Sequence, residues 1–118
     1  MDENINDWIS KKITSNDVVL FMKGTPETPQ CGFSSQVVQI LNYLGIEFSS
    51  VNVLENESIR NGIKEYTNWP TIPQLYVKNE FIGGADIVRE MFEENELKEF
   101  LKDKGIATNW LSWIELDN

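Results

Sequence analysis

The sequence has no histidine and only one cysteine, and these two shortages exclude much of the chemistry open to proteins. Without histidine there is no Ser-His or Cys-His catalytic pair and no histidine-ligated metal site. A single cysteine excludes a framework of internal disulfides and suits a reducing compartment, so we expect the protein in the cytoplasm. Any disulfide that this cysteine forms must be made with another molecule.

Long apolar runs and an excess of basic charge are also missing. The longest apolar run, Val18 to Met22, is far shorter than a membrane span, and the acidic first residues suggest neither a secretory signal nor a transit peptide. A net charge of −9 argues against nucleic-acid binding, for which a basic face is expected. We therefore expect neither a membrane nor a nucleic-acid partner. Five glutamates after Asp86 are expected on a solvated helix face: Glu90, Glu93, Glu94, Glu96 and Glu99.

The residues that are present fit one folded domain. The chain has 118 residues, of which 41% are hydrophobic, enough to bury a core. We expect a domain over residues 1–103, followed by a tail over residues 104–118. A short helix that packs onto the domain through Trp110 and Ile114 is the favoured form of the tail, and a partner or dimer contact is the alternative.

The cysteine lies where a strand is expected to give way to a helix. Val18 to Met22 is wholly apolar, which predicts a buried strand, and the prolines after it cannot continue a strand or a helix. Apolar residues at helical spacing then predict a helix from about Gly32 that stops at Gly45. Cys31 would lie at the helix N-terminus, where unpaired backbone N–H groups and the helix dipole favour a thiolate. This setting indicates a nucleophile or a metal ligand rather than a buried structural cysteine.

The residue three places after the cysteine is Ser34, a hydroxyl where a second thiol would allow an internal disulfide. Cys31 has no resolving thiol anywhere in the chain. An unpaired cysteine at a reactive position points to exchange with another molecule or to shared ligation of a metal.

The other elements follow from apolar spacing and turn residues. Before the cysteine strand, Ile5, Trp8, Ile9 and Ile13 indicate a helix that ends by residue 15. A second strand is expected from Phe48 to Val53. Ser58 is expected to cap the next helix, with an inner face that consists of Ile59, Ile63 and Tyr66. Strand, helix and strand form a right-handed unit, so the two strands should be parallel, with the cysteine at the carboxyl end of the first.

The second half of the chain predicts a hairpin and a helix. Residues 74–77 and 80–82 are short strands joined at Lys78-Asn79, which predicts an antiparallel pair. Asp86 is expected to cap the following helix, which continues through Leu101. The sum is an α/β domain with a small mixed sheet and helices on both faces.

Four blocks of residues, in this order and spacing, resemble one known family: Lys23, Cys31-Gly-Phe-Ser34, Trp69-Pro-Thr-Ile-Pro73 and Gly83-Gly-x-Asp86. The chain is similar to the monothiol glutaredoxins of the Cys-Gly-Phe-Ser class over residues 4–103. The resemblance implies a thioredoxin fold with a four-stranded sheet. It also implies glutathione binding and a homodimer that bridges a [2Fe–2S] cluster, which is passed to apo iron–sulfur proteins or a BolA-like partner.

The chemistry of the residues agrees with shared ligation. A [2Fe–2S] cluster held by four thiolates needs ligands from outside a chain that has one cysteine and no histidine. Cys31 from each of two protomers and two glutathione thiols would supply them. Dimerisation, glutathione binding and cluster binding would then form one linked equilibrium.

The resemblance also assigns charged groups to glutathione. Lys23 would meet the glycine carboxylate of glutathione or the thiolate. Arg60, with Lys64 one helical turn later, would offer a second cation to that carboxylate, and a solvated helix face is the competing interpretation. Asp86 would accept a hydrogen bond from the γ-glutamyl ammonium or cap its own helix.

The backbone would supply the other contacts. The segment Thr71-Ile72-Pro73 would present the backbone of Ile72 to the cysteinyl part of glutathione, which would pair with it as an extended peptide pairs with a strand edge. Pro73 is expected in the cis form, although trans is commoner among prolines. Gly84 allows close approach of the backbone, and the N–H groups at Ala85 and the following residue would hold the γ-glutamyl carboxylate. Family members often have cysteine or serine where this chain has alanine. Phe33 would cover the cysteine or lie at the dimer surface, and Trp69 is expected to pack near the site.

Three functions fit this sequence. Carriage and delivery of the [2Fe–2S] cluster is favoured. The alternative is a glutathione-dependent oxidoreductase in which Cys31 is the nucleophile and a second glutathione is the resolving thiol. This class usually reduces disulfides poorly, so we expect a weak enzyme at most. A regulatory module that senses iron or redox state would use the same site.

Overall fold

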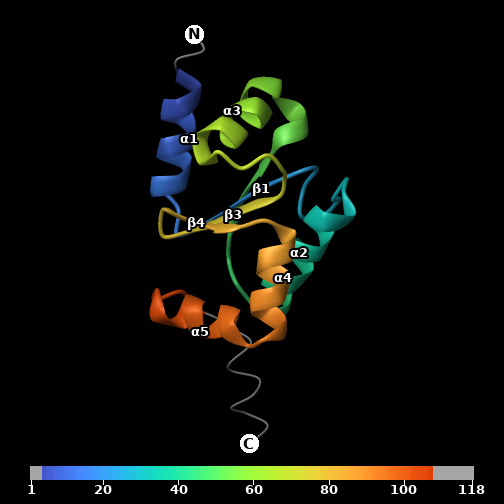
Figure 1. Ribbon diagram of the computed structural model, residues 1–118, viewed down its shortest axis with the longest axis vertical. Helices are drawn as coiled ribbons and strands as arrows, with labels where there is room; N and C mark the ends of the chain where they lie inside the picture. Colours follow the sequence, from blue (N-terminus) through green and yellow to red (C-terminus); the bar gives the residue numbers. More distant parts are fainter. Residues whose placement is uncertain (1–3, 108–118) are drawn as a thin grey trace, which may run out of the picture.

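The computed structural model describes residues 4–107, so the expected tail contact through Trp110 and Ile114 lies outside the described residues. Its centre is a four-stranded sheet with strand order β2-β1-β3-β4 (Figure 1). Strands β1 (Val18–Met22) and β2 (Ser49–Asn52) are parallel. Strand β3 (Gln74–Val77) runs antiparallel to both β1 and β4 (Glu80–Gly83). The mixed sheet that the sequence predicts is confirmed.

Strand β1 is central because both of its faces are covered. All five of its residues are buried. Val18, Leu20 and Met22 belong to one apolar cluster, whereas Val19 and Phe21 belong to the other. Successive strand residues point to opposite faces, so a wholly apolar strand needs a layer on each side.

Helices form these two layers (Figure 1). On one face α1 (Asn4–Thr14) packs against α3 (Glu57–Thr67), and on the other α2 (Gly32–Tyr43) packs against α4 (Ala85–Glu93). The last helix, α5 (Glu96–Asp103), follows α4, and its Leu97 and Leu101 are buried in the α2–α4 layer. A short 3-10 turn, η1 (Val53–Glu55), joins β2 to α3. This architecture is the thioredoxin fold that the resemblance implies.

Two predicted turns have the expected backbone. Gly45 follows the end of α2 with φ +71°, the left-handed conformation that glycine adopts without strain. Lys78 and Asn79 join β3 to β4 with φ +50° and +68°, the arrangement of a tight hairpin turn. The hairpin therefore forms without an Asn-Gly pair.

Two predicted helix caps are wrong. Asn56 caps α3, since its side chain accepts a hydrogen bond from the Ile59 N–H at 3.1 Å, and Ser58 lies inside the first turn. Gly84 occupies the cap position of α4, and Asp86 lies in the first turn, where its charge still faces the positive helix end. Strand β2 is also shorter than expected, because its predicted last residue, Val53, begins η1.

The inner faces of α1 and α3 are narrower than expected. Trp8 and Tyr66 are 42% and 41% exposed and do not belong to the buried core. Gly62 brings the two helices together: a Cβ there would lie 2.6 Å from Cγ2 of Ile5. The five glutamates expected on a solvated face are all exposed, as predicted: Glu90, Glu93, Glu94, Glu96 and Glu99. Between residues 4 and 107, none of the helices has the length and apolar character needed to cross a membrane.

Candidate functional site

Cys31 occupies the N-cap position of α2, as predicted. Its backbone is extended, with φ −154° and ψ 135°, and helical geometry begins at Gly32. The Cys31 carbonyl accepts the first hydrogen bond of the helix from the Ser35 N–H at 2.9 Å. The thiol is half-buried and unpaired. It is therefore accessible to a small molecule and lies beside the free N–H groups of the first turn.

The surroundings of Cys31 favour its thiolate. Burial acts to raise the pKa of the thiol. Hydrogen bonds from the backbone N–H groups of Ser34 and Phe33 oppose burial most strongly, followed by the charge of Lys23 and the Ser34 hydroxyl. The result places the pKa of Cys31 below its ordinary value, so a larger fraction of the sulfur is ionised at neutral pH.

Ser34 ties the thiol to the end of the central strand. Its side chain is fully buried, and its hydroxyl oxygen accepts a hydrogen bond from the Lys23 N–H at 3.1 Å. Because the oxygen is engaged as an acceptor there, the hydroxyl hydrogen is free to point to the Cys31 sulfur. The position that would hold a second thiol in a dithiol protein therefore acts here as a donor to the first.

The loop between β1 and α2 is folded on itself. The Gln30 N–H donates to the Lys23 carbonyl at 2.9 Å, which closes the loop at its base. Gly24 has φ +90°, and a Cβ on it would lie 2.6 Å from the Thr28 carbonyl oxygen. Its N–H donates to Oδ1 of Asn52, a tether from β2 that the sequence analysis missed. The loop thus delivers Lys23 and Cys31 to one side of the sheet.

These residues open onto a cleft of about 450 Å³. The cleft lies at the carboxyl end of β1, between the start of α2, the segment that precedes β3, and the start of α4. Among the residues that line it are the expected Lys23, Cys31, Phe33, Thr71, Ile72, Pro73, Gly84, Ala85 and Asp86. Every predicted site residue except Arg60 is therefore gathered at one place.

Arg60 does not line the cleft, whereas Lys64, its alternative one helical turn later, does. Both lie on the same face of α3, one turn apart, so their position along the helix axis decides which of them reaches the thiol side. The cations at the cleft are therefore Lys23 and Lys64. Asp86 supplies an acidic group, although it is exposed and pairs with Arg89 at 3.6 Å.

The backbone of the cleft is shaped by two close approaches. The Ile72-Pro73 peptide bond is cis, as predicted. Gly84 lies so near to it that a Cβ would be 3.2 Å from the Pro73 carbonyl oxygen and 3.5 Å from Nε1 of Trp69. The segment before β3 and the start of α4 thus meet through main chain, which leaves main-chain groups at the wall of the cleft.

Three further residues line the cleft: Trp69, Pro70 and Ile87. Trp69 was expected to pack near the site. Its ring packs 5.7 Å from that of Phe81, and its side chain, which is 38% exposed, also lines the cleft. Ile87 is 37% exposed in the first turn of α4. With Phe33, which is 59% exposed, they add exposed apolar side chains to a cleft that also holds charged ones.

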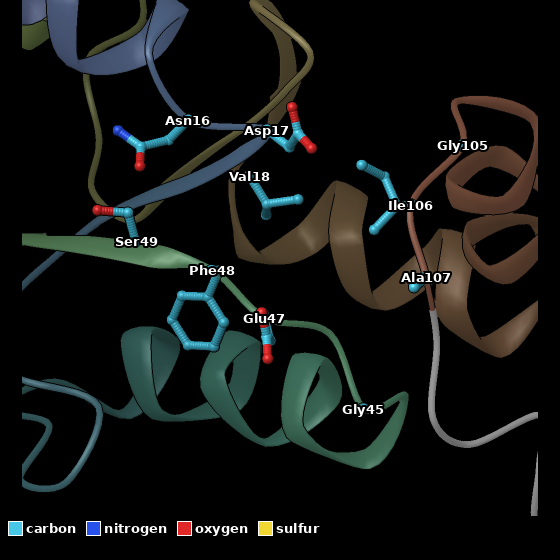
Figure 2. A pocket seen from close by; sticks show the side chains of 10 residues that line it. All are labelled: Asn16, Asp17, Val18, Gly45, Glu47, Phe48, Ser49, Gly105, Ile106 and Ala107. Atoms are coloured by element: carbon cyan, nitrogen blue, oxygen red, sulfur yellow. The ribbon is translucent and has the colours of Figure 1, made fainter.

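A second cavity, of about 590 Å³, is larger but lies at the opposite end of the two parallel strands (Figure 2). Its side chains come from the start of β1, the start of β2 and the segment after α5. They include two carboxylates, Asp17 and Glu47, but no cation and no thiol. We therefore assign the chemistry to the smaller cleft, because only that one holds a nucleophile.

Among residues 4–107 no group of three or more Cys, Asp or Glu side chains is arranged to bind a metal ion. The cleft offers one sulfur ligand, two cations and main-chain donors. Such a set suits an anionic peptide or thiol, and metal only when other molecules supply the remaining ligands.

A thioredoxin fold whose cleft holds one thiol of lowered pKa at a helix N-terminus, together with a cis-proline, is typical of proteins that react through a thiol. Comparison with known proteins identifies the family. Residues 18–82 match the Glutaredoxin family model. An uncharacterised monothiol glutaredoxin of Synechocystis is 57% identical over 94 residues, which are 80% of this chain and 88% of that protein.

Two further relatives agree. A probable monothiol glutaredoxin of Rickettsia typhi is 53% identical over 105 residues, or 88% of this chain and 95% of that protein. The solution structure of reduced poplar apo GrxS14 has a TM-score of 0.75 and 53% identity, and the match covers 85% of this chain and 92% of that one. The chain belongs to the glutaredoxin family, and within it to the monothiol glutaredoxins.

Proposed function

We propose that the protein binds glutathione in the cleft at Cys31 and that two copies carry a [2Fe–2S] cluster between them for delivery to other proteins. One observation carries the proposal: the only thiol of the chain is accessible and has a lowered pKa, and a buried hydroxyl stands where a resolving thiol would be. Such a thiol cannot form a disulfide within its own chain. It is suited to a bond with another molecule or a metal.

Glutathione fits the charges of the cleft. It carries two carboxylates and one ammonium, and the cleft provides Lys23 and Lys64 on one side and Asp86 on the other. We assign the glycine carboxylate to the two lysines and the γ-glutamyl group to the main-chain N–H groups at the start of α4. Between them, the main chain of Ile72 would pair with the cysteinyl residue.

The residues also fit a shared cluster. One chain provides one thiolate, and the cleft that holds it is open and lined by Phe33, Trp69 and Ile87. Two chains and two glutathione molecules complete four sulfur ligands. In this arrangement the protein binds and orients glutathione, lowers the pKa of Cys31, and surrounds the sulfur ligands with apolar side chains. Ligands held without covalent bonds to the chain suit transfer better than storage.

The test is anaerobic reconstitution with iron, sulfide and glutathione, followed by visible absorption, iron analysis and native mass. We expect a dimer with one [2Fe–2S] per two chains. Cys31→Ser and a sample without glutathione should both fail to form it, while Ser35→Ala, which removes a hydroxyl on the same helix that accepts a hydrogen bond from Gln39, should form it normally. A cluster that survives without Cys31 would sink the proposal.

The lowered pKa of Cys31 supports a second candidate, removal of glutathione from mixed disulfides. The Cys31 thiolate would attack the glutathionyl sulfur, release the substrate thiolate and form a Cys31–glutathione disulfide. A second glutathione thiolate would then attack the glutathionyl sulfur, release the Cys31 thiolate and leave oxidised glutathione. Brisk turnover of a glutathionylated peptide by the apo-protein would reverse our ranking.

The cellular setting is part of the proposal. A free thiolate persists only where disulfides are kept reduced, so we place the protein in a cytosol-like compartment. Apo iron–sulfur proteins and a BolA-like protein are the partners that cluster delivery would need. Mixing the reconstituted dimer with an apo-ferredoxin tests delivery directly, because the cluster should appear in the ferredoxin at the expense of the donor.

A further inference from the structure

Gln74 is a fully buried polar residue for which the sequence offers no role. Within residues 4–107 it shares full burial of a polar side chain only with Ser34. It is the first residue of β3, directly after the cis-proline, and its backbone pairs with Phe21 of the central strand. A polar side chain at this depth must have its hydrogen-bonding groups satisfied, since an unmet buried amide costs about 1–3 kcal/mol.

The amide nitrogen of Gln74 donates two hydrogen bonds to main-chain carbonyls at the wall of the cleft. It donates to the Trp69 carbonyl at 3.2 Å and to the Thr71 carbonyl at 3.2 Å. Both carbonyls belong to the segment between α3 and β3, residues 69–73, which we call the proline segment. These residues all line the cleft. A single side chain thus fixes two carbonyls of the segment from behind.

The amide oxygen of Gln74 anchors it to the core. It accepts from the Tyr76 hydroxyl at 3.0 Å and lies 3.2 Å from the Thr67 hydroxyl. The ring of Tyr76 packs against Phe21 at 5.7 Å, so the anchor reaches the central strand. The orientation of the amide is unique, because turning it over would set its oxygen against two carbonyl oxygens that can only accept.

We propose that Gln74 is a positioning residue for the glutathione site: it holds the proline segment in the path that presents the main chain of Ile72 to glutathione. This inference rests on the proposed function, since it concerns the same site. Gln74 does not itself line the cleft, so it acts through the segment that it holds. Its contribution is to keep that wall in place before glutathione arrives, which reduces the ordering that binding requires.

The test uses two replacements and a charge-matched control. Gln74→Glu keeps the shape but has no hydrogen for the two carbonyls when ionised. Gln74→Met keeps the length and carries the test if a buried charge prevents folding. Gln39→Glu makes the same change of charge at an exposed position of α2. Each variant is equilibrated with defined ratios of oxidised and reduced glutathione, and intact mass gives the fraction of protein that carries glutathione on Cys31.

The equilibrium is Cys31 thiol plus oxidised glutathione giving the mixed disulfide plus reduced glutathione. We expect this constant to fall about tenfold or more in both Gln74 variants and to stay near that of the wild type in Gln39→Glu. The iodoacetamide rate against pH is measured in parallel, so that any change in the thiol itself is subtracted. A role limited to stability would lower the urea midpoint and leave this constant unchanged in the folded protein.

The pH dependence of the glutathionylation constant distinguishes a positioning role of Gln74 from a general loss of structure in the variants. A Glu at this position faces two carbonyl oxygens, which raises its pKa, and its protonated form has one hydrogen to give back to one carbonyl. The deficit of Gln74→Glu relative to Gln39→Glu should therefore shrink between about pH 8 and about pH 5.5, whereas that of Gln74→Met should not.

The outcomes are distinct. If the Gln74 variants hold glutathione as firmly as Gln39→Glu, Gln74 has no positioning role and the proposed function stands. If the wild type holds glutathione no more firmly than a free cysteine does, the glutathione site itself is wrong, and this inference fails with it.

Discussion

Replacing Ser34 by alanine tests the central geometry of the site. The change removes the oxygen that accepts the Lys23 N–H at 3.1 Å and the hydroxyl that donates to the Cys31 sulfur. The first loss leaves a partly buried N–H without an acceptor, which costs about 1–3 kcal/mol when burial is complete. Because this N–H is only part-buried, we expect the free energy of unfolding to fall by about 1–2 kcal/mol.

The second loss changes the thiol. With one donor fewer, the thiolate is less stabilised and the pKa of Cys31 rises toward its ordinary value. Because the folded state lowers this pKa, the stability that the thiolate contributes is complete above the ordinary pKa and is lost as pH falls through the folded one. Ser34→Ala should narrow this pH window.

Two measurements check these expectations. Urea unfolding gives the free energy, and the rate of iodoacetamide alkylation against pH gives the pKa of Cys31. Ser35→Ala is the matched control, since that hydroxyl accepts from Gln39 on the outside of α2 at 3.1 Å and touches neither Lys23 nor the thiol. An unchanged alkylation profile in Ser34→Ala would refute the assignment of its hydroxyl as a donor to sulfur.

Three further predictions concern the cleft and its loop. Lys23→Gln should raise the pKa of the thiol, because it removes the positive charge beside the sulfur, and the alkylation profile would move to higher pH. Gly24→Ala should destabilise the protein by more than about 1 kcal/mol, since φ is +90° and the added Cβ would clash; Gly32→Ala, with nothing within 4 Å, should be neutral or stabilising in the same urea assay. Lys64→Gln should weaken glutathione binding measured by calorimetry, whereas Arg60→Gln should not, and the reverse order would show that the wrong cation has been placed at the cleft.

The elements around the thiol could be predicted because local signals agree there. Val18 to Met22 is apolar throughout and short, which favours a strand that is covered on both faces, and the structure shows such a strand. The prolines and Gly45 then mark where the next helix can begin and end. Cys31 falls at the N-cap for the same reason, so a lowered pKa of its thiol could be expected from position, whereas the added effect of the Ser34 hydroxyl could not.

Other details could not be predicted, because the sequence offers two residues that suit the same role equally well. Asn56 and Ser58 are both good N-cap residues two places apart, and only the structure shows that Asn56 accepts the hydrogen bond. Arg60 and Lys64 are both cations on α3, and the exact course of the helix decides between them. Gln74 was missed because its four side-chain contacts depend on how the segment after α3 folds back, which no spacing encodes.

The acidic surface has a consequence for how two copies meet. Each chain carries a net charge of −9, and the five glutamates from Glu90 to Glu99 are all exposed on α4, α5 and the turn between them. Two such molecules repel one another at long range, and repulsion of this kind fades beyond a Debye length, about 10 Å at 0.1 M and about 30 Å at 0.01 M ionic strength. If two copies pair around a shared cluster, as proposed, their pairing should therefore strengthen as salt is added, the opposite of an interface built on opposite charges. Raising the ionic strength would then favour the paired form, as raising the protein concentration does.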